Sequence, residues 1–131
     1  MSPIEIKTKR EKSLKNLPPE EKVDYIIDNG AVISIYKNGI RSPQEALEDR
    51  ETVAWLAMAY QFKVDKSDRK KVAKAAKGQG DPEFRESVNK GMYELAYEAI
   101  RRKRIACKVL EENKSVDEAT KETDEEMKNE F

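Results

Sequence analysis

Histidine is absent from the 131-residue sequence, and cysteine occurs once, at Cys107. Without histidine the chain lacks the side chain that most often serves as a general base or metal ligand. A single cysteine excludes an internal disulfide and is typical of a reducing compartment, so we expect an intracellular protein. The sequence therefore predicts a chain that is not an enzyme and that has no cofactor and no metal site.

Long apolar runs are also missing. The longest, from Val53 to Val64, is interrupted by Gln61 and Lys63 and falls short of the roughly 20 residues that span a membrane. The first residues, MSPIEIKTKREK, contain no apolar core of a secretory signal. Apolar residues make up 37% of the chain and charged residues 40%, against about 45–50% and 25% in ordinary domains. We expect a single domain with a lean core, an ionised surface and no membrane span.

Helix start and stop signals predict an all-α fold. Pro19 opens one helix, for which Gly30 is the expected end. Residues 31–37 are rich in β-branched side chains, as a strand would be, but the chain offers no partner strand. We therefore expect a second short helix that ends before Gly39.

Capping signals predict the remaining helices. Ser42 and Glu45 form a capping box, and we expect the helix that they begin to run to about Val64. A short, lysine-rich helix follows, and Asp81 then caps a long helix with an apolar stripe. Ser115 caps an acidic terminal helix or tail.

These signals define the expected architecture, which is a compact bundle of about four to six helices. Residues 1–16 form a basic N-terminal arm, residues 17–113 the helical domain, and residues 114–131 the acidic C-terminal helix or tail.

The formal net charge is zero, but the charges alternate in blocks. Residues 63–80 carry seven cations and two acids, and residues 101–108 carry five cations and no acid. Residues 109–131 carry nine acids and three cations. The basic segments can combine into one face that contacts phosphates without reading bases. The alternative is that they are solvated faces, cross-linked by ion pairs to the acidic blocks.

Arg102 stands on the apolar stripe of the long helix. Leu95, Ala99 and Ala106 line up at helical spacing, and Arg102 fills the gap between them. One interpretation is that Arg102 pairs with Glu98 one turn back while its stem lies along apolar surface. The other is that the stripe is interrupted because the helix meets an anionic surface. For this residue alone, the pairing is slightly favoured.

Three features combine across the whole chain. They are a basic arm, KTKREKSLK, two basic helices, DRKKVAKAAKGQG and IRRKRIACK, and an apolar segment, VAWLAMAYQF, suited to an interface. Many lysines and glutamates with no histidine are also typical of proteins from hot environments. In this combination the chain resembles the coat proteins of filamentous and rod-shaped viruses of hyperthermophilic archaea. The resemblance implies paired helical subunits that wrap double-stranded A-form DNA through phosphate contacts.

The sequence is accordingly interpreted as a structural DNA-coating protein that self-assembles, found in the host cytoplasm and the virion. Its expected partners are double-stranded DNA and further subunits. The residues expected to neutralise phosphates are Lys7, Lys9, Arg10, Lys70, Lys71, Lys74, Lys77, Arg101, Arg102 and Arg104. Those expected to make core and subunit contacts are Trp55, Met58, Tyr60, Phe62, Tyr93 and Tyr97.

The rival interpretation is a small helical regulator of a virus or mobile element that binds a host protein. A coat protein should self-associate and carry its basic segments on one continuous face. A regulator should be a monomer or dimer, with those segments scattered and engaged in internal ion pairs.

Overall fold

The computed structural model describes residues 16–131, and these form helices and short connections with no strand among them. The prediction of an all-α chain is confirmed. The predicted basic arm, apart from Asn16, lies outside the described residues. In chain order the helices are α2 (Pro19–Ile26), the π-helix η2 (Ile27–Ala31), α3 (Val32–Lys37), α4 (Pro43–Glu48), α5 (Arg50–Lys63), the 3-10 helix η3 (Lys66–Asp68), α6 (Arg69–Ala76), α7 (Pro82–Glu111) and α8 (Val116–Glu130).

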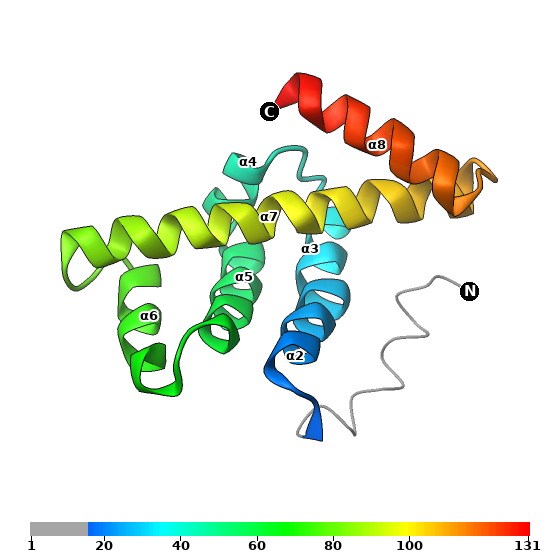
Figure 1. The fold of residues 1–131 in the computed structure, drawn as a ribbon. Helices are drawn as coiled ribbons and strands as arrows, with labels where there is room; N and C mark the ends of the chain where they lie inside the picture. Colours follow the sequence, from blue (N-terminus) through cyan, green and yellow to red (C-terminus); the bar gives the residue numbers. More distant parts are fainter. Residues whose placement is uncertain (1–15) are drawn as a thin grey trace.

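Helix α7 is the longest element and runs the length of the molecule (Figure 1). Helices α3, α4, α5 and α6 all contact it, and α8 lies along its C-terminal half. Because α6 contacts the N-terminal half, α6 and α8 lie near opposite ends of α7. This separation positions the charged surfaces described below.

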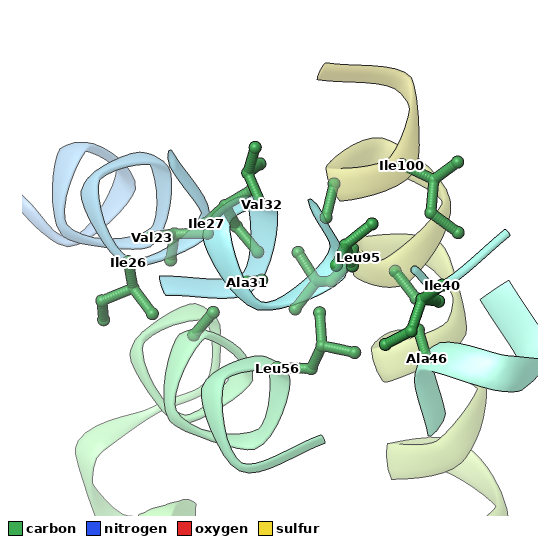
Figure 2. Close-up of a cluster of buried hydrophobic side chains, with 14 of the residues drawn as sticks. Val23, Ile26, Ile27, Ala31, Val32, Ile40, Ala46, Leu56, Leu95 and Ile100 are labelled. Carbon is green, nitrogen blue, oxygen red and sulfur yellow. The ribbon is translucent and has the colours of Figure 1, made fainter. Parts of the chain in front are cut away.

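The main core lies between α2, α3, α5 and α7 (Figure 2). Ile27, Leu56 and Ile100 are among its fully buried side chains. A second, smaller apolar cluster joins α6 to the first part of α7 and consists of Val72, Ala75, Val88 and Met92. Since this cluster holds one face of α6 against the molecule, the lysines of α6 point outwards.

The predicted helix end at Gly30 is wrong. The backbone continues from α2 through the single π-helical turn of η2 into α3. A Cβ atom added at Gly30 would lie 2.3 Å from ring carbons of Trp55. Glycine therefore serves here to let the α5 indole approach the helix backbone, and its position after two polar residues only imitates a stop signal.

The predicted single helix from Ser42 to about Val64 is also wrong, because it is divided at Asp49. This residue adopts an extended backbone (φ −83°, ψ 120°), and its carboxylate accepts a 2.9 Å hydrogen bond from the backbone N–H of Thr52. The Thr52 hydroxyl donates to the same carboxylate oxygen at 2.7 Å and contacts the Ser34 hydroxyl at 2.6 Å. The hydrogen bonds from Thr52 hold the pKa of Asp49 below its usual value. Asp49 thus begins a separate helix, α5.

The other predicted N-caps are confirmed. The Ser42 hydroxyl accepts from the N–H of Glu45 at 3.1 Å, and the Asp81 carboxylate accepts from that of Phe84 at 3.3 Å. The Ser115 hydroxyl accepts from the N–H of Glu118 at 3.1 Å. These caps satisfy N–H groups that have no partner inside their own helix.

The side chains predicted to make core and subunit contacts divide into two groups. Trp55, Tyr60, Phe62 and Tyr97 are partly buried and pack against the main core. Met58 and Tyr93 expose 44% and 40% of their surface. Of the six side chains, only Met58 and Tyr93 are exposed enough to make a large contact with another molecule.

Candidate nucleic-acid interface

The predicted phosphate contacts fall at two separate places in the described part of the chain. Lys70, Lys71, Lys74 and Lys77 lie on and directly after α6, whereas Arg101, Arg102 and Arg104 lie on the half of α7 that α8 covers. The remaining three, Lys7, Lys9 and Arg10, lie outside the described residues. Arg101 follows Met92, which packs under α6, by about 13 Å of helix. Among residues 16–131, therefore, the basic segments do not combine into one face.

The first group forms a surface that we call the α6 lysine face, consisting of Lys70, Lys71, Lys74 and Lys77. All four are exposed. Lys71 lies 3.7 Å from Asp68 in an exposed pair, which is a weak interaction. Within the described residues the other three make no ion pair. The α6 lysine face is thus a concentration of uncompensated positive charge.

Arg69 begins α6 but does not belong to this face. Its Nε donates to the backbone carbonyl of Gln61 at 3.2 Å, and its guanidinium lies 4.9 Å from the centroid of the Phe62 ring. Lys22 lies 5.3 Å from the same ring centroid. Arg69 therefore serves to attach α6 to the end of α5.

The turn after α6 forms an open groove of about 340 Å³, lined by Lys71, Lys74, Gln79, Gly80, Asp81 and Phe84. Gly80 has a φ of +90°, and a Cβ atom added there would meet nothing within 4 Å. The backbone at Gly80 is therefore sterically open to the close approach of a phosphate. Asp81 also lines the groove, however, and its carboxylate accepts the Phe84 N–H. The negative charge of this carboxylate opposes the binding of a phosphate at the start of α7.

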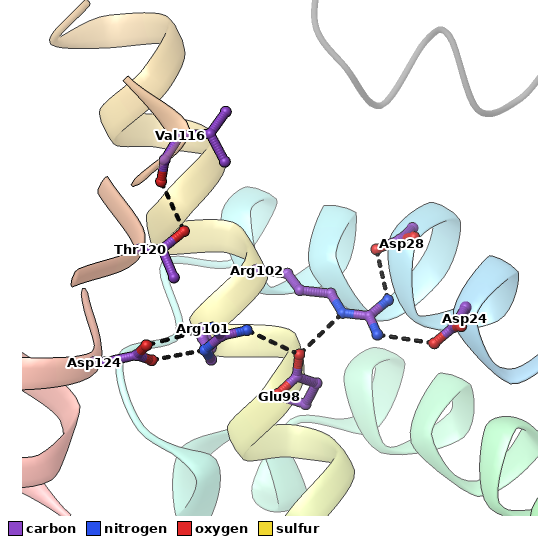
Figure 3. Close-up of polar contacts among 8 residues, drawn as sticks. All are labelled: Asp24, Asp28, Glu98, Arg101, Arg102, Val116, Thr120 and Asp124. Atoms are coloured by element: carbon purple, nitrogen blue, oxygen red, sulfur yellow. Dashed lines mark hydrogen bonds and ion pairs between the residues drawn. The ribbon is translucent and has the colours of Figure 1, made fainter. Parts of the chain in front are cut away.

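Arg102 is held by three carboxylates, one each from α2, η2 and α7 (Figure 3). Its guanidinium lies 2.8 Å from Asp24, 2.9 Å from Asp28 and 3.3 Å from Glu98. Burial alone lowers its pKa, but the hydrogen bonds with the two aspartates outweigh burial and raise the pKa above its usual value. The pairing with Glu98 is confirmed, and the cation on the apolar stripe joins α7 to α2 and η2.

The neighbouring arginines are engaged by α8. Arg101 Nε donates to Asp124 at 2.7 Å, and its Nη1 lies 3.3 Å from Glu98 (Figure 3). Arg104 lies 2.7 Å from Glu130 and 3.6 Å from Glu126. The hydrogen bond with Asp124 raises the pKa of Arg101. These two predicted phosphate contacts are thus already neutralised by carboxylates of the same chain.

Two further cations were missed as candidate residues. Lys108 pairs with Glu126 and Glu122, and Lys114 pairs with Glu122 and Glu112. Lys108 follows Arg101 and Arg104 at i+7 and i+4, so it falls on the same side of the helix. Helical spacing alone would have added Lys108 to the residues predicted to contact phosphates.

Few other chemical features stand out in residues 16–131. Burial raises the pKa of Cys107, so its thiol is not activated. No group of three or more metal-binding side chains is placed to hold an ion in this part of the chain. No helix within it is long and apolar enough to cross a membrane.

Comparisons with protein-family models, curated protein sequences and solved structures gave no match to this chain.

Proposed function

We propose that this protein coats nucleic acid as a structural subunit, and that the α6 lysine face makes its contact with the phosphate backbone. The observation that carries the proposal is the uneven compensation of charge. Four cations of α7 are paired with carboxylates, namely Arg101, Arg102, Arg104 and Lys108. Lys70, Lys74 and Lys77 make no ion pair with any described residue. Uncompensated lysines on one helix face suit a polyanion.

The chemistry of this face favours binding without sequence preference. Lysine ammonium groups act as flexible point charges, and they bind phosphates without the planar geometry that arginine offers to base edges. The face includes no aromatic stacking platform. Contact with backbone phosphates then releases counterions, and the affinity falls as salt rises. Double-stranded DNA and further subunits remain the proposed partners, and the basic arm and compact bundle remain predictions.

The test uses a variant that removes the lysine face, K70A/K71A/K74A/K77A. Alanine favours a helix, so α6 should remain folded. We expect affinity for a random-sequence DNA duplex at low salt, measured by fluorescence anisotropy, to fall at least tenfold. Each lost phosphate contact weakens binding by a similar factor whatever the DNA sequence.

A charge-matched control distinguishes a local contact from a general effect of charge. Lys63, Lys90, Lys121 and Lys128 are exposed and make no ion pair among the described residues. Changing these four to alanine alters the net charge equally and should reduce the affinity less than threefold. Equal losses in the two variants, or no binding by the unaltered chain at low salt, would contradict the proposal.

A protein-binding regulator is the second candidate, and two observations favour it. The basic segments are separated among residues 16–131, and Arg101, Arg104 and Lys108 are engaged in internal ion pairs, as we expect of a regulator. A groove of about 730 Å³ lies where α2, α5 and α7 meet, with Val23, Phe62 and Leu95 among its apolar lining residues. Glutamates, among them Glu20 and Glu94, also line it. Apolar surface with charged groups at its edge is typical of peptide-binding grooves.

Sedimentation separates the two candidates. A coat subunit should form assemblies larger than a dimer at micromolar concentration or on adding DNA. A regulator should remain a monomer or dimer and should leave DNA unbound.

A further inference from the structure

Helix α8 lies on a row of cations in the way that a polyanion would. The row, which we call the α7 cation row, consists of Arg101, Arg104 and Lys108. These residues stand at i, i+3 and i+7, so they share one side of α7 over about 10 Å. Along one strand of B-form DNA, where phosphates repeat about every 3.4 Å of helix axis, the same distance covers about three phosphates.

Every member of the α7 cation row is engaged by carboxylates of α8. Arg101 lies 2.7 Å from Asp124, Arg104 lies 2.7 Å from Glu130, and Lys108 pairs with Glu126. Their side chains retain 29%, 18% and 11% of their exposure. Helix α8 therefore both neutralises the row and covers it.

Apart from the ion pairs, α8 is attached by a narrow buried stripe and by Phe131 directly after it, whose ring centroid lies 6.2 Å from that of Tyr97. Only Ala119, Thr123 and Met127 are buried among its fifteen residues. The buried hydroxyl of Thr123 has no hydrogen-bond partner among the described residues. Of these three side chains, only Met127 belongs to the main core. Ion pairs are thus a large part of what holds α8 on α7, and exposed ion pairs are individually weak and screened by salt.

We propose that the α7 cation row is a second, latent site for nucleic-acid phosphates, and that α8 occupies it as an intramolecular substitute for the polyanion. Nucleic acid bound at the α6 lysine face raises the local phosphate concentration and displaces α8 from the row. The two arginines then form charge-assisted hydrogen bonds with phosphates in place of carboxylates. The proposed function supplies only the class of ligand, and the site itself rests on the contacts above.

The test neutralises the α8 carboxylates without removing the helix. The variant D124N/E126Q/E130Q removes the α8 partners of Arg101 and Arg104 and the principal partner of Lys108. We expect its affinity for a random-sequence DNA duplex at low salt to rise at least tenfold. The magnitude of the slope of log affinity against log salt should increase by about 2–3, at roughly 0.9 for each new phosphate contact.

A second α8 variant provides the matched control. Asp117, Glu118 and Glu125 are exposed and their side chains make no ion pair among the described residues. The change D117N/E118Q/E125Q alters the net charge by the same three units but leaves the row covered, so we expect a gain below threefold. Equal gains in the two variants, or no gain in the first, would overturn the proposal. If neutralising α8 loosens it, the row is still uncovered and the gain is still expected.

Two further variants test whether the gain in affinity comes from the α7 cation row and whether it is independent of the α6 lysine face. Adding R101A/R104A/K108A to the neutralised α8 should remove the gain, and a gain that persists would contradict the assignment. Combining the neutralised α8 with K70A/K71A/K74A/K77A should retain the gain. If the α6 variant binds DNA as tightly as the unaltered chain, only the proposed function is contradicted. If neutralising the α8 carboxylates gives no gain in affinity, only the latent site at the α7 cation row is contradicted.

Displacement itself is measured on the unaltered chain by hydrogen exchange. Saturating DNA duplex should speed exchange of the backbone amides over residues 116–130 at least tenfold. Unchanged protection of α8 in the complex would refute displacement.

Discussion

At the scale of single residues, Arg102 explains how a cation can stand on an apolar stripe. Asp24, Asp28 and Glu98 surround its guanidinium, and Asp28 retains only 15% of its side-chain exposure. The network is partly buried, since Arg102 retains 28% and Asp24 59% of its side-chain exposure. Removing the shared cation leaves the carboxylates without compensation, most of all the buried Asp28. Arg102 is therefore a structural residue between α7, α2 and η2.

Arg102→Ala should lower the free energy of unfolding by about 2–4 kcal/mol, since three carboxylates lose their shared cation. Urea unfolding followed by circular dichroism measures the change. Arg50→Ala is the control, because Arg50 is exposed and makes no ion pair among the described residues, and its effect should stay within about 0.5 kcal/mol. Similar losses of unfolding free energy in the two variants would show that Asp24, Asp28 and Glu98 do not need Arg102 as their shared cation.

Gly30→Ala should destabilise the protein by about 1–3 kcal/mol, because the new methyl group collides with a packed aromatic ring. The Cβ atom would lie 2.3 Å from the Trp55 indole. In a double-mutant cycle with Trp55→Leu, the cost of Gly30→Ala should fall by more than half, since the smaller side chain leaves room. Additive effects in the cycle would contradict a direct contact.

At the scale of helices, local signals were predictable and tertiary ones were not. The caps at Ser42, Asp81 and Ser115 depend on residues within one turn, so the sequence alone locates them. Gly30 was wrongly predicted to end a helix. Its actual role depends on the approach of Trp55, which follows it by 25 positions. The cap at Asp49 is an exception, because its contact with Thr52 lies within one turn and was nevertheless missed. Ser34 on another helix reinforces that cap. A one-dimensional pattern contains no information about such partners.

The attachment of α8 should depend on pH at both extremes. The hydrogen bond from Arg101 lowers the pKa of Asp124, and that from Lys114 lowers the pKa of Glu122. Stabilisation from these groups is present above the ordinary carboxyl pKa of about 4 and is lost as the pH falls through the lowered values. Hydrogen bonds to glutamates raise the pKa of Lys108 and Lys114. Their contribution is present below the ordinary lysine pKa of about 10.4 and is lost as the pH rises through the raised values.

Comparing the unaltered chain with Asp124→Asn isolates the acid limb. The variant should melt at a lower temperature at pH 7, and the difference should vanish once the pH has fallen through the lowered pKa of Asp124, because both chains then lack the charged carboxylate. A difference that persists unchanged in acid would show that the Asp124 charge does not hold α8.

At the scale of the whole molecule, the zero net charge hides an unequal distribution. The sequence correctly divided the chain into basic and acidic blocks, and it raised internal ion pairs as an alternative. It did not reveal which basic block is compensated, because that depends on where α8 folds back. Carboxylates of α8 engage Arg101, Arg104 and Lys108 of α7, whereas the lysines of α6 near the other end lack comparable partners.

The most direct test of the central claim is the salt dependence of DNA binding before and after removal of the α6 lysine face. Four phosphate contacts correspond to a slope of about 3–4 in log affinity against log salt. We predict that K70A/K71A/K74A/K77A reduces the magnitude of the slope by that amount. An unchanged slope would contradict the assignment of the phosphate contact to α6.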